Sequence, residues 1–145
     1  MTLESTGEGP GESLRVALVQ MAVEDGRPQQ NMARALEILD SADPAHMYLM
    51  PELWTTGYAH EVWDQAADSH TPTVVERLKA EAQDRSAWIG GSLVSRRADG
   101  RLANRFWLHS PGGDVTAAYD KTHLFGPMGE TGRLAPGAGR VRAAL

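Results

Sequence analysis

A strand–helix–strand pattern at the start of the chain restricts the fold more than any other feature. Leu14–Met21 (LRVALVQM) is a short apolar run bounded by polar sequence, which is typical of a strand buried on both faces. Apolar side chains then recur at helical spacing over about Pro28–Ser41, and His46–Met50 is a second apolar run. Because such crossovers nearly always join parallel strands, this opening predicts an α/β sheet.

The remaining predicted elements extend this sheet. A helix is predicted over about Thr71–Arg85, and a short helical turn precedes it at Trp63–His70. Further strands are predicted at Ala87–Ser95, Ala103–His109 and Val115–Lys121, with hairpin turns between them. The predicted fold class is therefore α/β, a mixed sheet with helices.

Composition is that of an ordinary soluble globular domain. The 145 residues suffice for one core, and 41% of them are hydrophobic and 23% charged. The net charge of -5 and the scattered basic residues argue against a nucleic-acid partner. No apolar run is long enough to span a bilayer, and the N-terminus lacks the basic and apolar regions of a secretory signal, so a cytoplasmic location is predicted.

Three segments are predicted along the chain. Residues 1–13 are rich in Gly, Glu, Ser and Thr, and predict a disordered tail. Residues 14–130 hold every predicted strand and helix, and form the N-terminal part of a domain. Residues 131–145 combine glycine, proline and arginine without periodicity, which predicts an irregular tail.

Charged residues stand at two predicted strand ends. Glu52 follows a strand inside PELWTTGY (Pro51–Tyr58), where the proline prevents the strand from continuing. Lys121 closes the last predicted strand, and Glu130 follows a short loop later. Strand exits are common places for chemistry in α/β sheets. A glutamate beside a lysine could take a proton while the ammonium stabilises an oxyanion, whereas the alternative for Lys121 is a solvated surface lysine.

Other readings of the same residues remain open. Trp54 and Tyr58 are candidate substrate-binding residues, or they anchor the loop in the core. Glu52 and Glu130 could instead form a glycosidase pair. The histidines lack the spacing of a metal site, and the cysteine count of zero excludes thiolate ligands and thiol catalysis within this sequence. Neither a metal nor a cofactor is predicted.

Two motifs carry a resemblance to a known family. PELWTTGY (Pro51–Tyr58) and YDKTHLF (Tyr119–Phe125) resemble the two N-terminal signatures of the nitrilase superfamily of carbon–nitrogen hydrolases, in its amidase-like branch. Asn31 and Asn104 also fall in the order expected for that family. The resemblance covers about residues 14–130, roughly the N-terminal half of the family's domain, and implies part of an αββα sandwich.

The resemblance also implies a reaction. A small non-peptide amide would be hydrolysed through an acyl-enzyme, with Glu52 as the general base, Lys121 stabilising the oxyanion and Glu130 as a second, positioning glutamate. The family commonly assembles as homo-oligomers. Its small-molecule substrate would be the partner here, with no nucleic acid and no membrane involved.

The family's nucleophile is a cysteine, and this sequence contains none. Without a covalent acceptor Glu52 has no proton to take, so the chain is expected to be inactive. A truncated or frameshifted family member is the expected cause, and a non-catalytic fragment or binding module is the alternative function. Since half a sandwich leaves sheet edges uncovered, marginal stability and aggregation are also expected.

Overall fold

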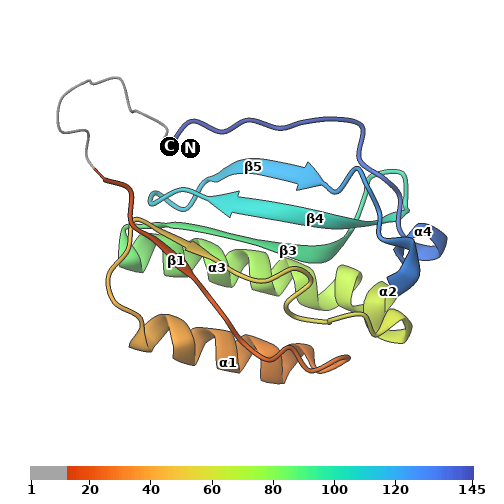
Figure 1. The fold of residues 1–145 in the computed structure, drawn as a ribbon, viewed down its shortest axis with the longest axis horizontal. Helices are drawn as coiled ribbons and strands as arrows, with labels where there is room; N and C mark the ends of the chain where they lie inside the picture. Colours follow the sequence, from red (N-terminus) through yellow and green to blue (C-terminus); the bar gives the residue numbers. More distant parts are fainter. Residues whose placement is uncertain (1–12) are drawn as a thin grey trace, which may run out of the picture.

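The computed structural model describes residues 13–145, and its centre is one five-stranded mixed sheet. The strands lie in chain order, β1-β2-β3-β4-β5 (Figure 1). β1 to β3 are parallel to one another, and the β3–β4 and β4–β5 pairs are antiparallel. The predicted mixed sheet is confirmed. The strand bounds are β1 Val16–Leu18, β2 Met47–Leu49, β3 Trp88–Arg96, β4 Leu102–His109 and β5 Val115–Asp120.

Two long helices pack on the same face of the sheet (Figure 1). Helix α1 (Pro28–Ser41) begins with a proline, which is favoured in the first turn because its missing N–H would be unpaired there anyway. Helix α3 (Thr71–Arg85) ends at Ser86, which adopts a left-handed conformation with φ of 49°. Both predicted helices are confirmed. Their buried residues Ala35, Leu39, Val74, Leu78 and Ala82 join Ile89 and Leu93 of β3 in the main core cluster.

The helical turn predicted at Trp63–His70 is confirmed, but it is continuous with α3. Helix α2 (Trp63–Gln65) continues through a π-helical turn at Ala66–His70 directly into α3, so the chain is helical throughout this region. A 3₁₀ turn at His60–Val62 leads into it. Together these turns bury Trp63 in a second core cluster, which lies at the end of the sheet formed by the carboxyl ends of β2 and β3.

One prediction about β1 is wrong. The apolar run was expected to be buried on both faces, yet Val16 is 44% exposed and Leu18 is 76% exposed. β1 is an edge strand, and α1 and α3 cover only one face of the sheet. A sequence run shows that side chains are apolar but does not show which neighbours will cover them. The marginal stability that we expect from uncovered sheet edges stays a prediction.

The chain after Glu130 is more ordered than predicted. Helix α4 (Glu130–Arg133) follows a 3₁₀ turn at Gly126–Met128, and Leu134 then pairs with Leu102 of β4. Leu134 is 6% exposed, so it belongs to the second core cluster. Beyond this bridge the described chain has no helix or strand. The tail predicted at residues 1–13 lies outside the described residues except for Ser13.

None of the helices in residues 13–145 combines the length and apolarity that crossing a bilayer requires.

His109 on β4 is expected to make folding pH-dependent. It is fully buried, and neither ring nitrogen has a hydrogen-bond partner within residues 13–145. Burial lowers the pKa of His109 below its usual 6.5. The negative charge of Glu76 on α3 acts to raise this pKa, whereas the positive charge of Lys79 acts to lower it. The neutral ring is therefore favoured in the folded state, and the unfolded state binds more protons. Stability should be complete above pH 6.5 and fall as the pH decreases below that value.

The measurement compares free energies of unfolding between about pH 7.5 and about pH 5.5, where histidine titrates. The variant His109→Leu should lose part of the pH dependence seen in the parent chain. The matched control is His123→Leu, because His123 is exposed. Equal slopes for the parent and His109→Leu would contradict this expectation.

Candidate active site

Glu52 and Lys121 meet because their strands point the same way. β2 runs parallel to β3, and β5 is antiparallel to β4, which is itself antiparallel to β3. The carboxyl ends of β2 and β5 therefore lie at one end of the sheet, where Glu52 comes after Met50 and Pro51 and Lys121 follows Asp120 directly. Lys121 was expected to close the last strand, and in fact lies one residue beyond β5. Its backbone N–H still donates to the carbonyl oxygen of Asn104 at 2.9 Å.

Four side chains form a closed ring, which we call the Glu–Lys cluster: Glu52, Asn104, Lys121 and Glu130. Lys121 Nζ lies 2.7 Å from Glu52 Oε1 and 2.8 Å from Glu130 Oε2. Asn104 Nδ2 donates to Glu52 Oε1 at 2.8 Å and to Glu130 Oε1 at 2.9 Å. Two carboxylates are thus linked twice, once by an ammonium group and once by a neutral amide.

Asn104 is the residue of this cluster to which the sequence assigned no role. It lies on β4 and is only 2% exposed. Its register opposite Val94 turns it toward the sheet face that α1 and α3 do not cover. A polar amide inside an otherwise buried strand is a usable signal, because buried polar groups normally have hydrogen-bond partners. The strand pattern alone could not name those partners.

Glu130 is the buried member of the cluster, with no exposed surface. Burial acts to raise its pKa, but hydrogen bonds from Lys121, the Phe125 backbone and Asn104 outweigh burial and hold that pKa below its usual value. The Phe125 N–H donates to Glu130 Oε2 at 2.6 Å. Glu130 is therefore ionised at neutral pH and supplies a fixed negative charge beneath Lys121.

Lys121 is protonated for the converse reason. Burial acts to lower the pKa of its amine, but hydrogen bonds to Glu130 and Glu52 raise that pKa overall. A lysine held in this way is a cation with fixed direction, suited to stabilising a developing negative charge. It is not suited to acting as a base, because the proton is held too firmly.

Glu52 is the exposed carboxylate of the cluster, with 47% of its side chain accessible. The Tyr58 hydroxyl donates to Glu52 Oε2 at 3.3 Å. Burial, followed by the negative charge of Glu52, raises the pKa of Tyr58, so the phenol keeps its proton. One oxygen of Glu52 thus faces Lys121 and Asn104, while the other faces Tyr58.

A loop with unusual backbone geometry holds Glu52 in place. Leu53 adopts a positive φ of 45°, and its N–H donates to Ser92 Oγ at 2.9 Å. Gly57 has φ of 57° and donates its N–H to the Leu53 carbonyl at 2.8 Å. A side chain at Gly57 would collide with Asp25, whose carboxylate accepts the Tyr58 N–H at 3.0 Å. The turn therefore requires glycine at this position.

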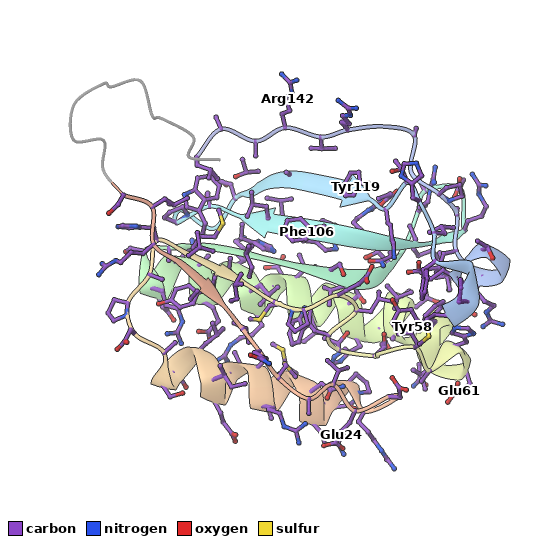
Figure 2. All side chains as sticks on the ribbon, in the orientation of Figure 1. Glu24, Tyr58, Glu61, Phe106, Tyr119 and Arg142 are labelled. Atoms are coloured by element: carbon purple, nitrogen blue, oxygen red, sulfur yellow. The ribbon has the colours of Figure 1, made fainter. Side chains whose placement is uncertain are left out.

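A cavity of about 300 Å³ opens beside the cluster. Its walls include Glu52, Asn104 and Lys121, together with the less polar side chains Met50, Phe106 and Tyr119. Figure 2 shows Phe106 and Tyr119 on the neighbouring strands β4 and β5, where they are register partners. Glu130 does not line this cavity, so it contacts Lys121 on the side that faces away from the cavity.

The two aromatic candidates have different positions. Tyr58 contacts Glu52, as described above. Trp54 is fully buried and packs in the main core cluster, and it is not part of the cavity wall. This position favours the second of the two readings for Trp54, a loop anchored in the core. Among residues 13–145, no group of three or more His, Asp or Glu side chains is arranged to hold a metal ion.

Together, fold and cluster define a mixed α/β protein with two carboxylates around a fixed ammonium group at one end of its sheet. The chain belongs to the carbon-nitrogen hydrolase family, whose model matches residues 15–142. The family match therefore continues past Glu130 and includes most of the segment that was expected to be an irregular tail.

Similar proteins include amidases. The chain is 27% identical to a 2-oxoglutaramate amidase of Bacillus subtilis, over 85% of this chain and 48% of that protein. It is 32% identical to omega-amidase YafV of Yersinia enterocolitica, over 81% of this chain and 44% of that protein. The chain spans about half the length of the curated relatives it matches.

Solved structures agree with the fold. A CN-hydrolase superfamily protein from Xanthomonas campestris superimposes with a TM-score of 0.79 at 32% identity, covering 88% of this chain and 48% of that one. An amidase from Nesterenkonia sp. matches with a TM-score of 0.76 at 27% identity, covering 93% of this chain and 52% of that one. The fold is thus that of carbon-nitrogen hydrolases, over about half of their length.

Proposed function

We propose that the chain carries the acid–base and oxyanion-binding part of an amide-hydrolysing site. Glu52 is the general base, Lys121 stabilises the tetrahedral oxyanion, and Glu130 positions Lys121. The observation that carries this proposal is the contact of Lys121 Nζ with both carboxylates, at 2.7 Å and 2.8 Å. The amidases among its relatives support the same chemistry.

The exposure of the two carboxylates supports different roles for them. In the proposed reaction Glu52 takes the proton of the attacking nucleophile and returns it to the departing ammonia. It has the solvent-accessible surface and the cavity position that proton transfer requires. Glu130 has no accessible surface, so it does not contact the substrate and acts through Lys121. The same burial argues against a glycosidase pair, because both carboxyl groups of such a pair must reach the sugar.

The nucleophile is the missing part of this site. Structures of the Nesterenkonia amidase include one with acrylamide added covalently at an active-site cysteine. These 145 residues contain no cysteine. We therefore propose that this chain alone binds a small amide beside Lys121 without hydrolysing it. A non-catalytic binding module is the second candidate function, and the same lack of a thiol favours it.

Butyramide is a suitable probe, because the Nesterenkonia amidase has been solved with it. We expect butyramide to shift the NMR signals of Tyr119 and of the Lys121 side chain, which line the cavity. We expect no ammonia above the rate of a Glu52→Gln control, since the site has no thiol to form the acyl-enzyme. Both measurements use the purified 145-residue chain.

Lys79 supplies an internal control for the binding measurement, because it lies on α3 with an exposed side chain. Its signal should remain unchanged in the same titration. Ammonia release that depends on Glu52 would contradict the proposed inactivity. Equal shifts at Lys79 and Lys121 would contradict a specific amide site.

A further inference from the structure

Glu130, the more deeply buried of the two carboxylates in the Glu–Lys cluster, comes directly after an exposed turn of the chain. The segment from Phe125 to Met128 is exposed at every residue, with Phe125 at 50% and Met128 at 42%. Gly129 then adopts φ of 79°, and the next residue, Glu130, has no exposed surface. Exposed turns are usually mobile, whereas the hydrogen bonds of Glu130 need a fixed carboxylate. The turn has its own backbone hydrogen bonds, from the Met128 N–H to the Phe125 carbonyl at 3.2 Å and from the Gly129 N–H to the Gly126 carbonyl at 2.8 Å, and a contact from outside the turn would restrict it further.

His60 makes that outside contact from a distant part of the sequence. Its Nε2–H donates to the Met128 carbonyl oxygen at 2.9 Å. Since a carbonyl can only accept, this bond requires a proton on Nε2. The Cα of Gly129 packs against the same ring, because a Cβ there would lie 2.3 Å from His60 Cε1. The imidazole therefore contacts the turn at the two residues that precede Glu130.

The imidazole is itself held by the second core cluster. Its ring lies over Trp63, with centroids 4.3 Å apart and planes inclined at 47°. Trp63 is fully buried, and its indole N–H donates to the Gly57 carbonyl at 3.1 Å. The His60 ring thus rests on a rigid base that also anchors the loop following Glu52.

A second bond links the His60 backbone to α4. Arg133 Nη2 donates to the His60 carbonyl oxygen at 3.0 Å, and Arg133 also lies 3.7 Å from Asp64 of α2. Figure 1 places α4 beside α2 at the same end of the molecule. His60 therefore binds the chain on both sides of Glu130, at Met128 and at Arg133.

We propose that His60 is a positioning residue, which fixes the turn before Glu130 and thereby holds the buried carboxylate against Lys121. A catalytic effect of His60 rests on the proposed function of Lys121. The effect of His60 on the position of Glu130 is independent of that proposed function. The alternative is a structural role only, in which His60 covers Trp63 and has no effect on Lys121. By sequence alone, His60 is one of the histidines that lack the spacing of a metal site.

The test measures the charge state of Lys121 in the full 145-residue chain. Lys79 and Lys121 are the lysines of the sequence, so ¹³Cε-lysine labelling gives one reporter signal and one control signal. His60→Phe keeps a ring over Trp63 and removes the donor to Met128. We expect the titration midpoint of Lys121 to fall, because a looser Glu130 stabilises the ammonium less. The matched control is His123→Phe, at an exposed histidine.

A double-mutant cycle with Gly129 gives a second readout. Gly129→Ala places a methyl group against the His60 ring and adds backbone strain at positive φ. In a His60→Ala background the clash is absent and only the strain remains. We expect Gly129→Ala to lower the midpoint of thermal unfolding less in that background than in the parent chain.

An unchanged Lys121 midpoint in His60→Phe, with only a lower unfolding temperature, would overturn the proposal and leave His60 a structural role. Strictly additive Gly129 and His60 effects would overturn it as well. The butyramide measurement separates this result from the proposed function. If the Lys121 midpoint moves in His60→Phe while the parent chain fails to bind butyramide, the proposed function fails and the positioning role stands.

Discussion

Replacing Lys121 with methionine is expected to lower the free energy of unfolding by about 3–5 kcal/mol, because it leaves the fully buried carboxylate of Glu130 without its charged partner. Glu130 would keep a fully buried carboxylate with hydrogen bonds only from Asn104 and the Phe125 backbone. Methionine is similar in length, so the lost charge accounts for the change. Urea unfolding of both chains at neutral pH measures the difference.

Lys79→Met provides the matched control. Lys79 lies 3.8 Å from Glu76 in an exposed pair, so its replacement should change the free energy of unfolding by less than about 0.5 kcal/mol. Adding Glu130→Gln to Lys121→Met should recover part of the lost free energy of unfolding, because the Glu–Lys cluster then holds no buried charge. If Lys121→Met costs no more than Lys79→Met, Lys121 and Glu130 do not form the buried pair described here.

Replacing Asn31 with alanine is the second large expected effect, a loss of about 2–4 kcal/mol from buried groups left without hydrogen bonds. Asn31 lies on α1 and is fully buried. Its amide accepts from the Glu24 N–H at 2.9 Å, and donates to the carbonyls of Glu24 at 2.7 Å and Thr55 at 2.8 Å. Thr55 belongs to the loop that follows Glu52, so the loop should loosen too.

Gln30→Ala separates this effect from a general change in α1, because Gln30 is exposed on the same helix and its replacement adds the same alanine. Urea unfolding measures stability, and hydrogen exchange at Thr56 and Gly57 measures the loop, since both amides bond to the Leu53 carbonyl. Faster exchange at these amides in Asn31→Ala alone is the expected result. Equal behaviour of the two variants would show that Asn31 does not hold the loop.

Local sequence patterns accounted for most of the helices and strands. The proline at the start of α1 and the apolar spacing in α3 have local physical causes, and both helices lie where those signals placed them. The strand ends carrying Glu52 and Lys121 were also predictable. Proline stops one strand, and the charge at the end of the other marks its exit from the sheet.

Exposure and cross-chain contacts were not predictable in the same way. The wrong expectation for β1 came from reading apolar residues as buried ones, although β1 lies at an edge of the sheet. The order after Glu130 was missed because it depends on the pairing of Leu134 with Leu102 and on His60, both distant in sequence. Such contacts carry no local periodicity for a pattern to detect.

By itself, the sequence determined the alternation of elements, the family resemblance, the presence of Glu52 and Lys121 at strand ends, and the absence of a thiol within these residues. The resemblance also named Glu130 as a candidate, whereas only the tertiary structure decided that Asn104 joins these three residues. Asn104 reaches both carboxylates because β4 pairs with β3 in one register. A shift of one residue would turn its side chain to the face that α1 and α3 cover, because strand side chains alternate between faces.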